Sequence, residues 1–144
     1  MENIVMGKVV VQAAIENLED LVDVRRGQMA ADRVRRVDVS NALVDTGAST
    51  LMLPQSLIRQ LGLTHLRDRP ARTVGGNVSL PIYGTVRLTI QNRECTLDVC
   101  EIRDDLPVLV GQVPLELMDW VVDPNGQKLI GNPEHGGEQM IDVL

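Results

Sequence analysis

Apolar and polar residues alternate over much of this chain, which is the pattern of a β-strand with one buried face. The segment KVVVQAAI (8–15) places Val9, Val11, Ala13 and Ile15 on one such face. Similar alternation predicts strands at residues 20–25 and 33–39 around a polar loop, and an apolar run predicts another at residues 41–44. The first third of the chain is therefore predicted to consist of strands joined by loops.

One segment has helical spacing instead. In LPQSLIRQLGL (53–63), Pro54 suits a first helical position, Leu57, Ile58 and Leu61 share a face, and Gly62 can end the helix. A second short helix is predicted at residues 114–118.

Turn residues join the remaining strands into hairpins. The segment RTVGGNVSLPIYG (72–84) predicts a hairpin with its tip at Gly75-Gly76-Asn77, and residues 85–102 predict another around QNRE. The apolar strand PVLVG ends at Gly111, and strands at 120–122 and 127–130 flank the turn DPNG. We therefore expect an all-β domain over residues 1–131, folded as a small closed barrel with one or two short helices.

The amino-acid composition is consistent with an all-β domain and argues against several kinds of binding partner. The chain of 144 residues has no Phe, one Trp and one Tyr, so its core must consist of Val, Leu, Ile and Met. A net charge of −6 and the near absence of aromatic residues argue against a nucleic-acid partner. Cys95 and Cys100 are expected to be reduced thiols, and the isolated His65 and His135 predict no metal site and no cofactor.

The beginning of the sequence shows no basic start followed by an unbroken apolar run, and no segment has the length of a membrane span. We therefore expect a cytoplasmic protein with no membrane partner.

The stretch NALVDTGASTLMLP (41–54) carries the most specific candidate chemistry. An apolar strand runs directly into Asp45-Thr46-Gly47, and apolar residues resume at Leu51. Because an ionised carboxylate is costly to bury, a lone Asp at the end of a buried strand needs an explanation. An ordinary turn is one explanation, since Asp, Thr and Gly are turn residues. A catalytic carboxylate is the other.

This stretch resembles the active-site segment of retropepsin-like aspartic proteases, and other elements follow in that family's order. A Gly-tipped hairpin lies downstream where the family carries its flap, and VLVG (108–111) matches its apolar-apolar-Gly motif. The segment MDWVVDPNGQKLI resembles the closing hairpin of bacterial single-domain members. The resemblance covers roughly residues 8–131 and implies an acid-protease barrel with one lobe per chain.

The resemblance also implies an aspartic endopeptidase, in which one ionised and one protonated carboxyl group act together on a water molecule and a peptide carbonyl. Since the chain contains a single Asp-Thr-Gly, it supplies half of such a site. A two-fold homodimer would place Asp45 beside its own copy. The expected partners are therefore a second copy of the chain and a peptide or unfolded-protein substrate.

Neighbours of Asp45 take roles from the same resemblance. Thr46 is expected to hydrogen-bond across the two-fold axis, and Gly47 to let the backbone approach the carboxylates. Ala48 is small where pepsin-like enzymes usually carry Ser. Val110 and Gly111 form the second loop motif, expected to cross beneath the catalytic loop.

The flap is expected to close over substrate through Val74, Gly75, Gly76 and Asn77. Tyr83, on the returning strand, either lines the pocket or packs against the body of the domain.

Two positions depart from the viral-type pattern, which has an acidic residue after Asp-Thr-Gly-Ala and Arg after the second motif. Ser49 and Gln112 are neutral here. The alternative function is therefore a catalytically silent retropepsin-like dimer that serves as a binding or scaffold module. The tail at 132–144 is expected to be flexible or to form a dimer-interface strand, with NIVM (3–6) and MIDVL (140–144) as candidate interface strands.

Overall fold

The computed structural model describes residues 8–123 and 125–143, so the candidate interface strand at residues 3–6 lies outside the described part. The strands are β1 (Val9–Asn17), β2 (Arg36–Val44), β3 (Leu51–Pro54), β4 (Thr64–Thr73), β5 (Gly76–Ile90), β6 (Arg93–Ile102), β7 (Leu109–Val110), β8 (Trp120–Asp123) and β9 (Lys128–Gly131). The helices are α1 (Leu18–Arg25), α2 (Gln55–Leu61) and α3 (Gln112–Met118), with single 3₁₀ turns η2 (Ala31–Arg33) and η3 (Pro133–His135).

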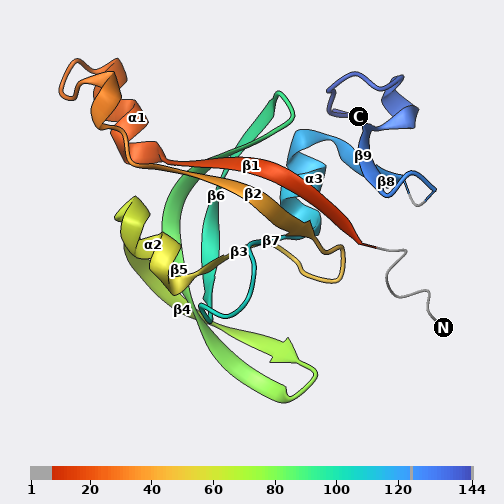
Figure 1. Cartoon of the computed structure of the whole chain (residues 1–144), viewed down its shortest axis with the longest axis horizontal. Coiled ribbons are helices and arrows are strands. Elements are labelled where there is room, and N and C mark those ends of the chain that lie inside the picture. The colour runs from red at the N-terminus through yellow and green to blue at the C-terminus, as the bar shows by residue number, and fades with distance from the viewer. Residues whose placement is uncertain (1–7, 124, 144) are drawn as a thin grey trace.

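The main sheet closes on itself, which confirms the predicted all-β barrel. Its strand order is β1-β2-β7-β3-β6-β5-β4, and β1 also pairs with β5 from Ala14↔Thr89 to Asn17↔Val86. The ring therefore runs from β1 through β2, β7, β3, β6 and β5 back to β1. Among the described strands β4 pairs only with β5, and β4 with the N-terminal half of β5 projects below the barrel as a long hairpin (Figure 1).

Aliphatic side chains fill the barrel, as the composition requires. Val9, Val11, Ala13 and Ile15 all face inward, which confirms the alternation predicted for β1. The largest fully buried side chains are those of Ile15, Leu51, Leu53, Leu61, Leu88, Ile90, Leu115, Met118, Val9, Val86, Val99 and Val110. Burying one such side chain contributes about 1.5–3 kcal/mol to folding.

The predicted strand at residues 20–25 is wrong, because this segment lies in α1. The Asn17 side chain caps the helix by accepting a hydrogen bond from the backbone N–H of Asp20 at 3.1 Å. Asp20 is buried and binds the Arg35 guanidinium, with Nε–Oδ2 and Nη2–Oδ1 distances of 2.9 Å. A cap and an ion pair therefore hold α1 in place, and neither produces a helical apolar pattern in the sequence.

Most other predicted elements are confirmed with shifted ends. The two strands predicted at 33–39 and 41–44 form one strand, β2, which begins only at Arg36, because Arg33 belongs to η2. The helix expected at 53–63 is α2, which ends at Gly62 with φ of 63°. The helix expected at 114–118 begins two residues earlier, as α3. No helix in the described ranges combines the length and apolar character that crossing a bilayer requires.

The hairpin predicted at 72–84 is longer than expected and its tip is displaced. β4 and β5 pair from Thr64↔Gly84 to Thr73↔Gly76, so the turn residues are Val74 and Gly75 rather than Gly75-Gly76-Asn77. Gly76 begins β5 with φ of 119°, a value that side chains disfavour. Hydrophobic patterning did not predict residues 64–71 of β4, because nearly all the residues of this strand are exposed.

The segment after β9 packs against Asp119, the residue that ends α3. Asp119 Oδ2 lies 2.6 Å from His135 Nδ1 and accepts the backbone N–H of Met140 at 3.1 Å. Asn132 Nδ2 donates to Asp119 Oδ1 at 3.1 Å. The predicted domain boundary at residue 131 stays a prediction.

This contact makes stability depend on pH. The hydrogen bond from His135 lowers the pKa of Asp119 to about 2, and the same bond raises the pKa of His135. The stabilisation of the fold by His135 is complete below the ordinary histidine pKa of 6.5 and is lost as pH rises through the raised pKa. The stabilisation of the fold by Asp119 is complete above the ordinary aspartate pKa of 3.8 and is lost as pH falls through the lowered pKa of about 2. The contact is therefore strongest between about pH 4 and 6.5.

We expect Asp119→Asn to return the His135 titration, followed by NMR, toward the ordinary histidine value. The melting-temperature difference between wild type and this variant should be largest near pH 5–6 and shrink above the His135 pKa. His65 is the other histidine of the chain and serves as an internal control. An unchanged His135 titration in the variant would contradict the assigned contact.

Candidate active site

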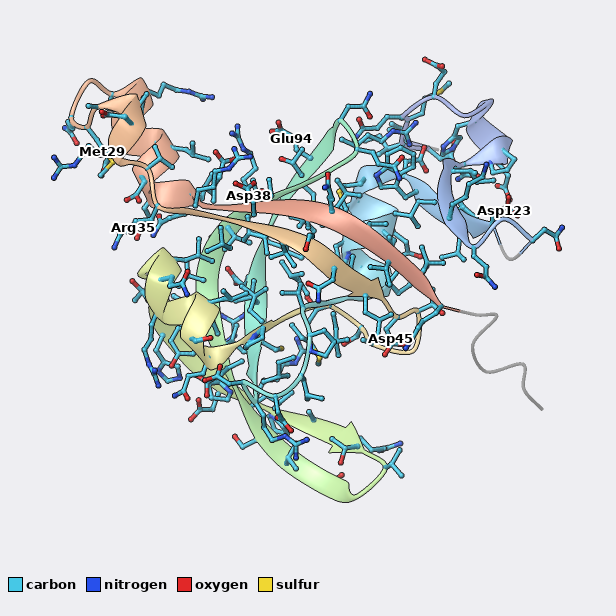
Figure 2. All side chains as sticks on the ribbon, in the orientation of Figure 1. Met29, Arg35, Asp38, Asp45, Glu94 and Asp123 are labelled. Carbon is cyan, nitrogen blue, oxygen red and sulfur yellow. The ribbon has the colours of Figure 1, made fainter. Side chains whose placement is uncertain are left out.

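Asp45 follows the last residue of β2 and lies in the loop of residues 45–50, the Asp45 loop (Figure 2). Its backbone N–H donates to Val110 O at 2.9 Å, and its Oδ1 accepts the N–H of Gly47 at 2.9 Å. The N–H of Ala48 donates to Asp45 O at 3.0 Å. The residue is only half-buried, so the turn holds the carboxyl group in place and leaves it accessible.

Strand β7 passes between the two strands that carry the Asp45 loop. It pairs in parallel with the end of β2 through Val44↔Val110 and antiparallel with β3 through Leu51↔Val110. Beyond β7, Gly111 N donates to Thr50 O and Gln112 N donates to Ala48 O, both at 2.9 Å. The segment after β7 is thus joined to the Asp45 loop by backbone hydrogen bonds.

Two glycines make this arrangement sterically possible. A Cβ at Gly111 would lie 2.5 Å from both Ala48 O and Thr50 O, well inside contact distance. A Cβ at Gly47 would lie 3.2 Å from Asp45 Oδ1 and would press on the carboxylate. Gly111 therefore lets the segment after β7 approach the backbone of the Asp45 loop, and Gly47 leaves room beside the carboxyl group.

A cleft of about 660 Å³ separates the Asp45 loop from the β4–β5 hairpin. Its loop wall contains Gly47, Ala48 and Ser49. Its hairpin wall contains Arg67, Arg69, Arg72, Leu80 and Ile82. The size suits a short peptide segment with its side chains.

Several predicted flap residues lie away from this cleft. Val74 and Gly75 form the hairpin turn, where Val74 is fully exposed, and Gly76 and Asn77 begin β5; none of the four is among the residues that line the cleft. Tyr83 packs against the barrel core, with its ring centroid 5.3 Å from that of His65.

Sequence reasoning missed the arginines of β4. Their signal was the cluster of basic residues in THLRDRPART, but that segment was not recognised as a strand, so its side chains could not be placed.

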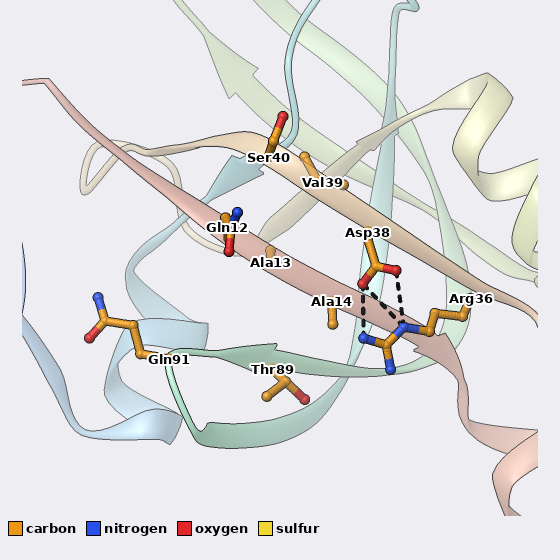
Figure 3. Close-up of a pocket in the computed structure, with 9 residues that line it drawn as sticks. All are labelled: Gln12, Ala13, Ala14, Arg36, Asp38, Val39, Ser40, Thr89 and Gln91. Carbon is orange, nitrogen blue, oxygen red and sulfur yellow. Dashed lines mark hydrogen bonds and ion pairs between the residues drawn. The ribbon is translucent and has the colours of Figure 1, made fainter.

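A second hollow lies on the outer faces of β1 and β2 (Figure 3). The Arg36 guanidinium there binds the Asp38 carboxylate with an Nη2–Oδ1 distance of 2.9 Å. Because its two charged side chains already pair with each other and no residue of the Asp45 loop lines it, this hollow offers no candidate chemistry.

Neither thiol nor metal chemistry has a candidate site in the described residues. Cys95 and Cys100 are free, and burial raises the pKa of the Cys95 thiol to about 11. Burial likewise raises the pKa of Cys100. No group of three or more His, Cys, Asp or Glu side chains is arranged to hold a metal ion within residues 8–123 and 125–143.

Residues 33–116 match the sequence model of the family described as "gag-polyprotein putative aspartyl protease". The match covers more than half of the 144 residues. It includes β2, the Asp45 loop, the β4–β5 hairpin, β7 and most of α3. Comparison with curated proteins gives no match.

The close approach at Gly111 predicts a steric effect of substitution. We expect Gly111→Ala to destabilise the fold by about 1–3 kcal/mol, because its methyl group must displace the backbone of the Asp45 loop. The free energy of unfolding in urea, at fixed protein concentration, measures this. Gly75→Ala is the matched control, since the nearest atom to its Cβ would be Thr73 Oγ1 at 3.9 Å. Equal stability of the two variants would contradict the proposed packing.

Proposed function

Because the chain belongs to the gag-polyprotein aspartyl protease family, we propose that it is an aspartic endopeptidase, a hydrolase that cleaves peptide bonds. The observation that carries the proposal is the placement of Asp45, which is half-buried, is held by backbone hydrogen bonds, and belongs to a loop that lines an open cleft through Gly47, Ala48 and Ser49. A cytoplasmic location and a bacterial origin stay predictions from the sequence.

The proposed reaction needs two carboxyl groups that share one proton. The ionised group takes a proton from water as the water oxygen attacks the peptide carbonyl carbon. The protonated group donates its proton to the carbonyl oxygen, and the tetrahedral intermediate then collapses as the amine leaves with a proton. The two groups titrate as a unit, so neither role belongs permanently to one of them.

A homodimer would supply the second carboxyl group. The chain has a single Asp-Thr-Gly, and a two-fold axis beside the Asp45 loop would bring two copies of Asp45 together. The exposed side of the loop supports this proposal, since Thr46 and Gly47 are both exposed in the single chain. Thr46 would then hydrogen-bond to the second copy of the loop.

The β4–β5 hairpin is proposed as the flap. Its two strands form one wall of the cleft beside Ala48, and its fully exposed tip at Val74 leaves it room to move. Closure of such a hairpin excludes water from a bound substrate and orders the reacting groups.

The neutral residues beside the site favour a second candidate function, a catalytically silent dimer used for binding. Gln112 donates from Nε2 to Glu116 Oε2 at 3.3 Å, within its own helix, so its side chain is engaged along α3. Ser49 carries no charge that could hold a second copy in place. Without these charges two copies can associate without bringing the Asp45 carboxyl groups together, so this candidate predicts a dimer that cleaves nothing.

We expect Asp45→Asn to abolish cleavage of a denatured protein substrate while the fold is retained, because an amide cannot take a proton from water. Gel analysis of the digest, with and without the inhibitor pepstatin, measures the activity, and circular dichroism checks the fold. Asp32→Asn is the matched control, since Asp32 is an exposed carboxylate in η2 outside the cleft. Near-wild-type activity of purified Asp45→Asn would exclude Asp45 from catalysis.

We also expect activity to depend on pairs of chains. Specific activity should fall on dilution, with a quadratic dependence on protein concentration once dimers dissociate. Mixing wild type with an equal amount of Asp45→Asn should leave about one quarter of the dimers with two aspartates after random exchange. Constant activity per wild-type chain, in a sample shown to be monomeric, would contradict the shared site.

A further inference from the structure

Positive charge is concentrated on one wall of the cleft. The chain carries 14 Lys and Arg against 20 Asp and Glu, yet Arg67, Arg69 and Arg72 fall within six residues of β4 and all three line the cleft. The opposite wall, at Gly47, Ala48 and Ser49, is small and uncharged. An acidic protein therefore has a basic surface beside its candidate active site.

Only part of this charge is neutralised within the chain. Arg67 Nη2 lies 3.6 Å from Asp98 Oδ2, and Asp98 Oδ1 also accepts a hydrogen bond from Thr85 Oγ1 at 2.8 Å. Neither Arg69 nor Arg72 forms an ion pair with any residue that the structure describes. Arg69 and Arg72 therefore line the cleft without a counter-charge from the described part of the chain.

Two neighbours, Cys100 and Leu80, indicate that the Arg69 side chain points into the cleft. Cys100 lines the same cleft from β6, and the positive charge of Arg69 opposes the burial that raises the pKa of this thiol. Arg69 also pairs across the hairpin with Leu80, another residue of the cleft wall. Both observations place Arg69 within the cleft and not on the outer face of the hairpin.

From this charge distribution we infer that the cleft selects peptide segments with acidic side chains near the cleaved bond. The inference rests on the proposed function and adds a substrate class to it. Guanidinium groups bind carboxylates through paired, charge-assisted hydrogen bonds, and closure of the hairpin removes water that would weaken them. A basic side chain at the same position would be repelled. A single-stranded oligonucleotide, the competing anion, carries a negative charge on every phosphate, so a chain with net charge −6 repels it more strongly than a peptide with one or two carboxylates.

The test uses a bond that the protein cleaves in a denatured protein, identified by mass spectrometry. Three peptides spanning that bond carry Glu, Gln or Lys at the flanking positions and are otherwise identical. We expect kcat/KM to fall in the order Glu, Gln, Lys, with a Glu-to-Gln ratio of about threefold to tenfold at low salt. The ratio should approach one at high salt, because counterions screen the charges.

Variants assign the preference to particular side chains. Arg69→Gln and Arg72→Gln should each lower the Glu-to-Gln ratio. Arg25→Gln, in α1 and outside the cleft, removes the same charge and should leave the ratio unchanged. An equal fall in the Arg25 variant would show a general charge effect and overturn the inference.

The remaining outcomes distinguish failure of the acidic preference from failure of the proposed protease function. Equal cleavage of the three peptides would overturn the acidic preference and leave the proposed protease function intact. If no bond is cleaved, the protease function fails, and anisotropy of fluorescein-labelled peptides that differ only by Glu for Gln decides the preference. Tighter binding of the Glu peptide than of the Gln peptide supports the inference. Equal affinity, or tighter binding of a labelled oligonucleotide, overturns it.

Discussion

The backbone pairing of β7 with the ends of β2 and β3 is the constraint on which the site depends. Val110 accepts the N–H of Asp45, and Gly111 donates to Thr50, so both ends of the Asp45 loop are held by one short strand. This contact requires glycine at position 111, where a methyl group would overlap two carbonyl oxygens. The carboxyl group is thus positioned by main-chain geometry, which the surrounding aliphatic core makes rigid.

The closed barrel connects the strands that hold the Asp45 loop to the strands that carry the β4–β5 hairpin. The pairing of β1 with residues 86–89 holds the C-terminal half of β5 in the barrel, while the N-terminal half of β5 pairs with β4 in the projecting hairpin. The hairpin is attached to the body along β5 and β6, while its tip is free. One barrel therefore provides both a rigid support for Asp45 and a projecting wall opposite to it.

The parts of the fold that bury one face could be predicted from the sequence. The alternation in β1 correctly predicted the buried face formed by Val9, Val11, Ala13 and Ile15. Gly62 correctly predicted the end of α2. The motif at Asp45 and the apolar-apolar-Gly motif at Gly111 were recognised together, and the structure joins them by hydrogen bonds.

The parts held by polar contacts could not be predicted in this way. α1 depends on the cap at Asn17 and the buried Asp20–Arg35 pair, and a pair distant in sequence leaves no periodic signal. β4 is exposed on both faces, so hydrophobic patterning could not distinguish it from a loop. Because β4 was missed, the arginines of the cleft were missed with it.

We propose that two copies of Asp45 meet at a two-fold axis to form one catalytic site. A crystal structure of the protein with a bound peptide-like inhibitor would locate both carboxyl groups. We expect a dimer in which the two Asp45 carboxyl groups lie about 3 Å apart, facing the inhibitor. A dimer with the two Asp45 side chains far apart, or a monomer that binds the inhibitor elsewhere, would contradict it.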